Sequence, residues 1–136
     1  MTFSSPSRRA AIDIWQPRHD NGRALQIHLV TPRRDLVVRE FLHEGELDFV
    51  HVYWSPDETT VGISATGTID IDLACNVATG GQVPFDTVRK GLAESIRATY
   101  HLRPDQDPFQ WQLEPEARHG FFKLHPEINV DYHPRR

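Results

Sequence analysis

The chain has 136 residues, enough for one domain with a hydrophobic core that needs no disulfide or metal for stability. Charged residues make up 25% and hydrophobic residues 38%, which is typical of a folded, soluble protein. The one cysteine, Cys75, excludes an internal disulfide and a multi-cysteine zinc or iron–sulfur site made by this chain alone. No apolar run is long enough for a transmembrane helix, and the first residues lack the apolar core of a signal peptide. We therefore expect a cytoplasmic protein with no membrane partner.

The net charge of −4 is distributed unevenly along the chain. Residues 1–39 contain seven Arg and three Asp, whereas residues 40–88 contain nine Asp and Glu and no Lys or Arg. An acidic segment of this length indicates a basic partner or a cation. A solvated surface that serves only solubility is the alternative.

The first third of the chain predicts a flexible tail and a hairpin. Residues 1–9 are rich in Ser, Pro and Arg, which is typical of a tail, so the folded domain is expected over residues 10–136. Alternating apolar residues predict strands at 10–15 and 24–30, joined by a turn that contains Asn21-Gly22.

A short helix is predicted over residues 32–43. Thr31 is a suitable N-cap, Pro32 suits the first helical position, and Gly45 would end the helix. A strand through residues 36–38 is the alternative.

The rest of the chain predicts a buried strand, a second hairpin and a long helix. Residues 47–54 are apolar on both strand faces, which is typical of a central strand covered on both faces. Alternation predicts a hairpin formed by residues 60–64 and 68–73. Over about residues 84–101, apolar residues recur every three or four positions, which predicts a helix with one buried stripe. Three further strands are predicted at 109–113, 121–124 and 128–132.

The order of these elements predicts the fold class. Strands cluster before and after one long helix, and the chain has no internal repeat. We therefore expect a single α+β domain with a largely antiparallel sheet of about six or seven strands.

No group of residues indicates a catalytic, metal or cofactor site. Residues 43–46 (His-Glu-Gly-Glu) lack the second histidine of a zinc-binding helix, and the other histidines have no standard ligand spacing. Cys75 follows a strand, and nothing in the sequence places a histidine beside it, so we expect a packed residue. Residues 79–82 (Thr-Gly-Gly-Gln) match no phosphate-binding motif.

Nucleic-acid binding requires a basic stripe with interleaved aromatic residues. The basic residues lie mainly near the two ends of the chain and would form one surface only if the fold brought them together: Arg8, Arg9, Arg33, Arg34, Arg135 and Arg136. The acidic middle of the chain would repel phosphate, so no nucleic-acid partner is expected.

The acidic segment instead indicates binding to a basic protein. Trp54 is a residue type that anchors interfaces, although core packing is the alternative, and it lies beside an acidic turn. Strand alternation places Asp70 and Asp72 on one face. Such charges increase the rate of association with a basic partner. The predicted partner-binding residues are Glu44, Glu46, Trp54, Asp57, Glu58, Asp70 and Asp72.

Several short segments, in this order, resemble bacterial polymorphic-toxin immunity proteins. They are Phe49–Tyr53 (FVHVY), Thr60–Ser64 (TVGIS), Gly67–Ile71 (GTIDI), Val83–Val88 (VPFDTV), Gly91–Ile96 (GLAESI), Arg103-Pro104 and Phe109–Trp111 (FQW). The resemblance covers about residues 46–112 and is to the small α+β type paired with deaminase-like or other nucleic-acid-targeting toxins. It implies a non-enzymatic protein without a cofactor, which occludes the active site of a toxin made by the same cell.

Charge and resemblance lead to the same hypothesis. Toxins that act on nucleic acid are basic around the active site, because they attract phosphate there, and a small acidic protein can fill that site. The alternative is a small α+β enzyme or ligand-binding protein with a pocket between sheet and helix, lined by His28, Asp48 or His51. A structural subunit would also bind a partner.

Overall fold

The computed structural model describes residues 1–16, 24–41 and 47–113, which form seven strands and two helices. Sheet A has the strand order β1-β2-β3-β4, with β1 (Thr2–Ser4), β2 (Ala11–Trp15), β3 (Gln26–Thr31) and β4 (Arg34–Glu40). Sheet B has the order β5-β6-β7, with β5 (Leu47–Trp54), β6 (Thr60–Gly67) and β7 (Ile71–Asn76). The helices are α1 (Asp86–Tyr100) and α2 (Pro108–Trp111). The α+β class is confirmed, but its antiparallel strands form two sheets instead of one.

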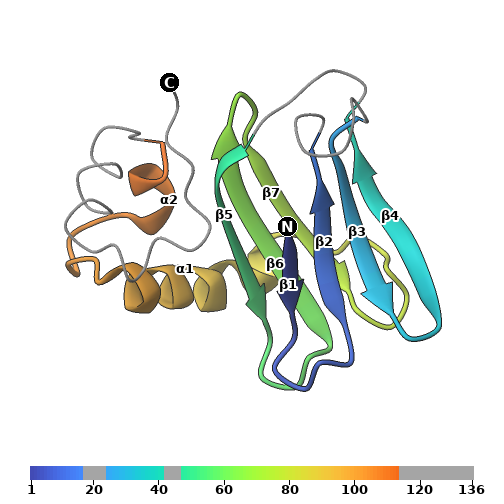
Figure 1. The fold of residues 1–136 in the computed structure, drawn as a ribbon. Helices are drawn as coiled ribbons and strands as arrows, with labels where there is room; N and C mark the ends of the chain where they lie inside the picture. Colours follow the sequence, from blue (N-terminus) through green and yellow to red (C-terminus); the bar gives the residue numbers. More distant parts are fainter. Residues whose placement is uncertain (17–23, 42–46, 114–136) are drawn as a thin grey trace.

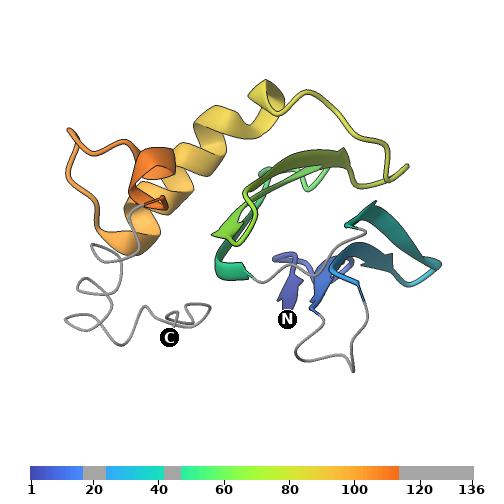
Figure 2. The ribbon, with the colours of Figure 1, turned by 90° about the horizontal axis from the view of Figure 1, so that it is seen from above.

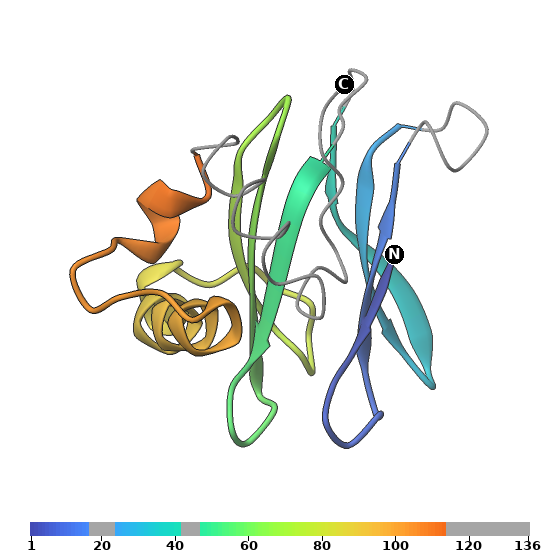
Figure 3. The ribbon, with the colours of Figure 1, turned by 60° about the vertical axis from the view of Figure 1, so that its left-hand side comes forward.

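The elements form three layers (Figure 1). Figure 2 shows sheet B in the middle, with sheet A on one side and α1 on the other. In Figure 3 the two sheets face each other, and both helices lie on the side of sheet B away from sheet A. Sheet B is therefore covered on both faces, whereas described elements cover sheet A on one face only.

Strand alternation builds the core between the sheets. In sheet A alternate residues of two strands are buried on the side of sheet B: Ile12, Ile14, Ile27 and Leu29. Burial of one aliphatic side chain of this size contributes about 1.5–3 kcal/mol to stability. Sheet B faces these residues with Val50, Val61, Ile63, Ala65, Ile71, Leu73 and Cys75. His28, on the other face of β3, is buried as well.

A second core lies between sheet B and the helices. Phe49 on β5 contacts the rings of Tyr100 and Trp111, with centroid distances of 5.1 and 5.7 Å. Leu92 and Ile96, both fully buried on α1, complete this core. The predicted long helix and its buried stripe are confirmed. Neither helix in the described part of the chain has the length and apolarity needed to cross a membrane.

Both predicted hairpins are present, but the second consists of residues 60–67 and 71–76 instead of 60–64 and 68–73. The predicted double-sided burial of β5 is confirmed, although β5 is an edge strand of sheet B and not a central one. β2 pairs with β3, and β6 pairs with β7, as antiparallel neighbours. Phe49 is buried on the helix side of β5 and Val50 on the side of sheet A. The turn at Asn21-Gly22 lies outside the described residues.

The helix predicted over residues 32–43 is wrong, because β4 occupies residues 34–40. The two-residue turn at Pro32-Arg33 joins β3 to β4, and Leu36 pairs with Leu29. The fixed φ of proline suits a tight turn as well as the start of a helix. Pairing with β3 and partial burial of Leu36 therefore outweigh the local signal for a helix.

The segment predicted as a flexible tail, residues 1–9, contains a strand. β1 pairs with β2, with Thr2 opposite Asp13 and Phe3 opposite Ile12. Phe3 also packs against the core between the sheets. Met1 packs there too, and these apolar contacts and the backbone pairing hold the segment, although its composition is that of a tail.

The strand predicted over residues 109–113 is also wrong, because α2 occupies this position. The side chain of Asp107 accepts hydrogen bonds from the backbone N–H groups of Phe109 (2.9 Å) and Gln110 (3.4 Å). Pro108 takes the first helical position, so cap and proline together start a helix here. Two further predicted strands lie outside the described residues, at 121–124 and 128–132.

Gly62 on β6 allows α1 to approach sheet B closely. A Cβ atom at this position would lie 2.7 Å from Val88 Cγ2. We expect Gly62→Ala to lower the free energy of unfolding by about 1–3 kcal/mol, because the added carbon must displace Val88 or α1. Gly81→Ala is the matched control, since a Cβ atom there meets only Thr79 Oγ1, at 3.3 Å, in an exposed loop. Urea denaturation measures both variants, and equal losses would contradict this account.

Candidate functional site

The acidic residues predicted to form one binding surface lie in different parts of the fold. Asp57 and Glu58 occupy the turn between β5 and β6, whereas Asp70 lies in the connection between β6 and β7. Successive turns of an antiparallel sheet lie at opposite ends, so the eight residues of β6 separate these acids by roughly 25 Å. Glu44 and Glu46 lie outside the described residues.

Asp72 and Trp54 lie on opposite faces of sheet B. Asp72 accepts a hydrogen bond from Ser64 Oγ (3.3 Å) on the helix side, and partial burial raises the pKa of its carboxyl group. Trp54 is half-buried and packs against the core between the sheets. The structure therefore does not bring the predicted binding residues together on one continuous surface.

Hydrogen bonds fix the turn that carries Asp57 and Glu58. Asp57 Oδ1 accepts from Ser55 Oγ (2.8 Å) and from the Oγ1 and backbone N–H of Thr59 (2.8 and 3.1 Å). Thr59 is the main cause of the lowered pKa of Asp57. Glu58 Oε1 accepts from Ser7 Oγ (2.7 Å), which is the main cause of the lowered pKa of Glu58. The hydrogen bond from Ser7 to Glu58 also joins the β1–β2 loop of sheet A to the β5–β6 turn of sheet B.

This turn borders a cleft of about 700 Å³ at one end of the two sheets. The β1–β2 loop, the β3–β4 turn and the residues after β7 form its other sides. Its charged lining residues are Arg9, Arg33, Asp57 and Glu58. The fold thus places Arg9 and Arg33 in the same cleft as two of the predicted binding residues, Asp57 and Glu58.

His51 lies buried between β5 and α1. Its Nε2 is 2.8 Å from Ser95 Oγ, and its Nδ1 is 3.5 Å from Tyr100 OH. Burial lowers the pKa of His51 to about 4, so the ring is neutral near pH 7. With a partner for each nitrogen, His51 serves as a core residue of the helix–sheet interface.

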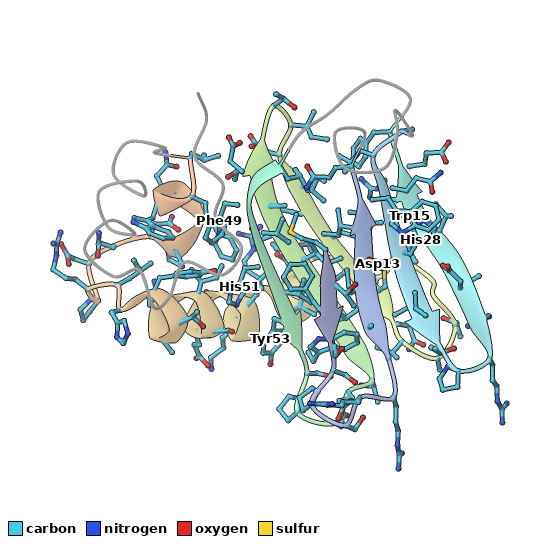
Figure 4. All side chains as sticks on the ribbon, in the orientation of Figure 1. Asp13, Trp15, His28, Phe49, His51 and Tyr53 are labelled. Carbon is cyan, nitrogen blue, oxygen red and sulfur yellow. The ribbon has the colours of Figure 1, made fainter. Side chains whose placement is uncertain are left out.

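The residues of the predicted sheet–helix pocket do not converge. Figure 4 shows His28 on sheet A, whereas His51 lies on the helix side of sheet B. Asp48 is buried on β5. Cys75 is buried in the core between the sheets, where desolvation raises the pKa of its thiol, contrary to what a nucleophile needs. Among the described residues, no three His, Cys, Asp or Glu side chains are grouped so that they could hold a metal ion.

Aromatic and acidic side chains meet on the outer face of sheet A, where Figure 4 labels three of them. The rings of Trp15 and His28 are stacked, with centroids 3.9 Å apart and planes inclined by 25°. Trp15 Nε1 donates a hydrogen bond to Asp13 Oδ2 (2.8 Å), and His28 Nδ1 lies 2.6 Å from Asp35 Oδ1. The stacked pair is therefore held between two carboxylates.

Gln26 connects this pair to a third carboxylate. Its Nε2 donates to Glu40 Oε2, and its Oε1 lies 2.8 Å from His28 Nε2. Val37, opposite His28 on β4, is 50% exposed and adds apolar surface. We name this set the outer-face cluster: Asp13, Trp15, Gln26, His28, Asp35, Val37 and Glu40.

Strand alternation explains why this cluster contains acids and no arginine. β4 directs Asp35 and Glu40 outward, opposite Val30 and Gln26 on β3. Its arginines donate hydrogen bonds to the loop after β7: Arg34 and Arg39. No outward-pointing residue of the four strands is Lys or Arg. The summed charge of residues 1–39 is positive and therefore gave no indication of this acidic face. The alternation of side chains along β2 and β4 would have indicated it.

Comparison of the chain with protein-family models, with curated proteins and with solved structures finds no match.

Acidification is expected to weaken the fold through His51. The unfolded chain takes up a proton near pH 6.5, whereas the folded state does so only near pH 4. Above about pH 6.5 His51 is neutral in both the folded and the unfolded state and does not change the free energy of unfolding. As the pH decreases to 4, only the unfolded chain is mostly protonated at His51, and the free energy of unfolding falls by about 3 kcal/mol.

The variant His51→Gln, which lacks this titration, should lose less stability between pH 7 and pH 4 than the wild type, by about 3 kcal/mol. Urea denaturation at a series of pH values measures the difference. Parallel stability curves for the two proteins would show that His51 does not stay neutral in the folded state.

Proposed function

We propose that this protein is a non-enzymatic, immunity-type inhibitor that binds a basic protein through the outer-face cluster. The observation that carries the proposal is the arrangement of three carboxylates around a stacked Trp–His pair. The pair lies on a sheet face that no other described element covers (Figure 2), with Trp15 partly exposed and the stacked His28 itself buried. A basic protein offers the complementary charge.

The three carboxylates contribute unequally to the charge of this face. The side chain of Asp35 is 51% exposed and that of Asp13 is 31% exposed. The amino group of Met1 lies 3.9 Å from Asp13 Oδ1 and offsets part of its charge. Asp35 and Glu40, both on β4, therefore supply most of the attraction for a basic partner, which increases the rate of encounter.

Trp15 is suited to anchor the interface. Tryptophan is one of the residue types on which binding energy concentrates. Its ring is held by stacking on His28 and by the hydrogen bond to Asp13, so little rotamer freedom remains to be lost on binding. The exposed side chain of Val37 extends the apolar area beside it.

The resemblance over about residues 46–112 is the reason for placing the partner among toxins. Carboxylates can occupy a site that attracts phosphate, so an acidic face suits a nucleic-acid-targeting toxin. We propose that the protein acts in the cytoplasm of the cell that makes the toxin. Its action as an inhibitor requires occlusion and no catalytic residue, cofactor or metal.

Charge reversal on the outer face should slow binding. The immobilised wild-type protein first captures its partner from a native lysate at low salt, and the partner is then identified and purified. We expect Asp35→Lys combined with Glu40→Lys to slow association at least about tenfold, and added salt then no longer slows it further. Trp15→Ala should raise Kd about thirtyfold, as expected for an anchor residue. Surface plasmon resonance at several salt concentrations measures both effects.

The matched control is Asp70→Lys combined with Asp72→Lys, which changes the net charge equally at the connection between β6 and β7. If this variant binds more slowly and the outer-face variant does not, the interface lies there and the outer-face proposal fails. A captured partner that is not basic, or that has no activity for the protein to inhibit, would overturn the proposed function. Circular dichroism confirms that each variant folds.

A further inference from the structure

The cleft at the end of the two sheets is separate from the outer-face cluster and carries charges of both signs. Sheet A contributes Arg9 and Arg33 from its loop and turn, and sheet B contributes Asp57 and Glu58. Its volume of about 700 Å³ lies in the range of small-molecule sites, about 300–1,000 Å³. A ligand in this cleft would meet guanidinium groups from one sheet and carboxylates from the other.

The guanidinium group of Arg33 is available to a ligand. Arg33 is exposed and makes no hydrogen bond or ion pair with any described residue. Arg9, by contrast, acts weakly on Glu58: the Ser7 hydroxyl is the main cause of the lowered pKa of that carboxyl group, and the charge of Arg9 makes the smallest contribution. Arg33 can therefore bind a carboxylate through two parallel N–H donors.

The carboxylates of the cleft keep both charge and acceptor capacity. Asp57 uses only Oδ1 for the hydrogen bonds of its turn, which leaves Oδ2 as an acceptor. Glu58 is fixed by the hydrogen bond from Ser7 to Oε1. Two carboxylates held in place by their own turn can accept hydrogen bonds from an ammonium group.

We propose that this cleft binds a small zwitterion, of the class of short peptides with free ends, with its carboxylate on Arg33 and its ammonium on Asp57 and Glu58. A simple anion would be repelled by the two carboxylates, and a simple cation by the arginines. The apolar lining at Pro32 and Val77 suits the uncharged part of such a ligand.

The probe is trialanine in four forms: with both ends free, N-acetylated, C-amidated, and blocked at both ends. Each form is titrated into the ¹⁵N-labelled full chain, and amide and arginine Nε–H shifts are recorded. We expect saturable shifts at the residues that line the cleft. The free tripeptide should bind about tenfold more tightly than either singly blocked form, because each block removes one charge-assisted contact.

Arg33→Gln should make the free tripeptide bind as weakly as its amide. Arg103→Gln is the matched control, since Arg103 is an exposed arginine paired with Asp105 (3.2 Å) and does not line the cleft. Equal affinity for the free and amidated tripeptides, or equal loss in both variants, overturns the proposal. The absence of saturable shifts at millimolar tripeptide also overturns it. Inorganic phosphate is titrated in the same way, and if it binds more tightly than the tripeptide, the cleft is a site for anions only and the proposal fails.

Discussion

The burial of sheet B on both faces is the constraint on which the rest of the structure depends. On β6, Val61 and Ile63 are fully buried against sheet A, while the alternate residues Gly62 and Ser64 face the helices. The helix side cannot be wholly apolar, and its buried polar groups are paired, as at Ser64 Oγ, which donates to Gln112 Oε1 (3.0 Å). Thr66 Oγ1 donates to the backbone carbonyl of Gln112 (3.1 Å). The segment after α2 is therefore held on sheet B by hydrogen bonds as well as by the aromatic core around Phe49.

Sheet A and the helices cover the two faces of sheet B, so sheet A is an outer layer of the fold (Figure 2). Sheet A buries one face against sheet B, and no described element covers its other face, which carries charged side chains. The parity of each strand then sorts the charges: acids of β2 and β4 point outward, while Arg34 and Arg39 reach the loop after β7. The same alternation that builds the core thus produces a surface more acidic than the local composition. Because Asp35 is bound to the stacked His28, the side chains of this surface are held by contacts within the protein itself.

The parts of the fold that could be predicted are those with a strong local period. The stripe of α1 and the alternation of β2, β3, β6 and β7 extend over enough residues to identify the element. Thr31-Pro32 was misleading because the same dipeptide suits both a helix start and a turn, and only pairing with β3 decides between them. The outer-face cluster could not be predicted from composition, since Trp15 and Asp35 meet only through His28 on the strand between β2 and β4. Division into two sheets depends on long-range packing, which local patterns do not contain.

The end cleft follows from hairpin geometry, and its backbone is unusual. Among the residues that the structure describes, three non-glycine residues have left-handed φ angles, and one of these, His101, is the ordinary C-cap of α1. The other two are Arg8 (φ 62°) and Glu58 (φ 58°), each in a connection that borders the cleft. A left-handed conformation costs a side-chain-bearing residue roughly 1–2 kcal/mol, so glycine would be the favourable choice at both positions. Glu58 in return gains the contact with Ser7, which joins the two sheets at this end. Arg8 does not line the cleft, whereas the strained backbone of Glu58 places its charged side chain there.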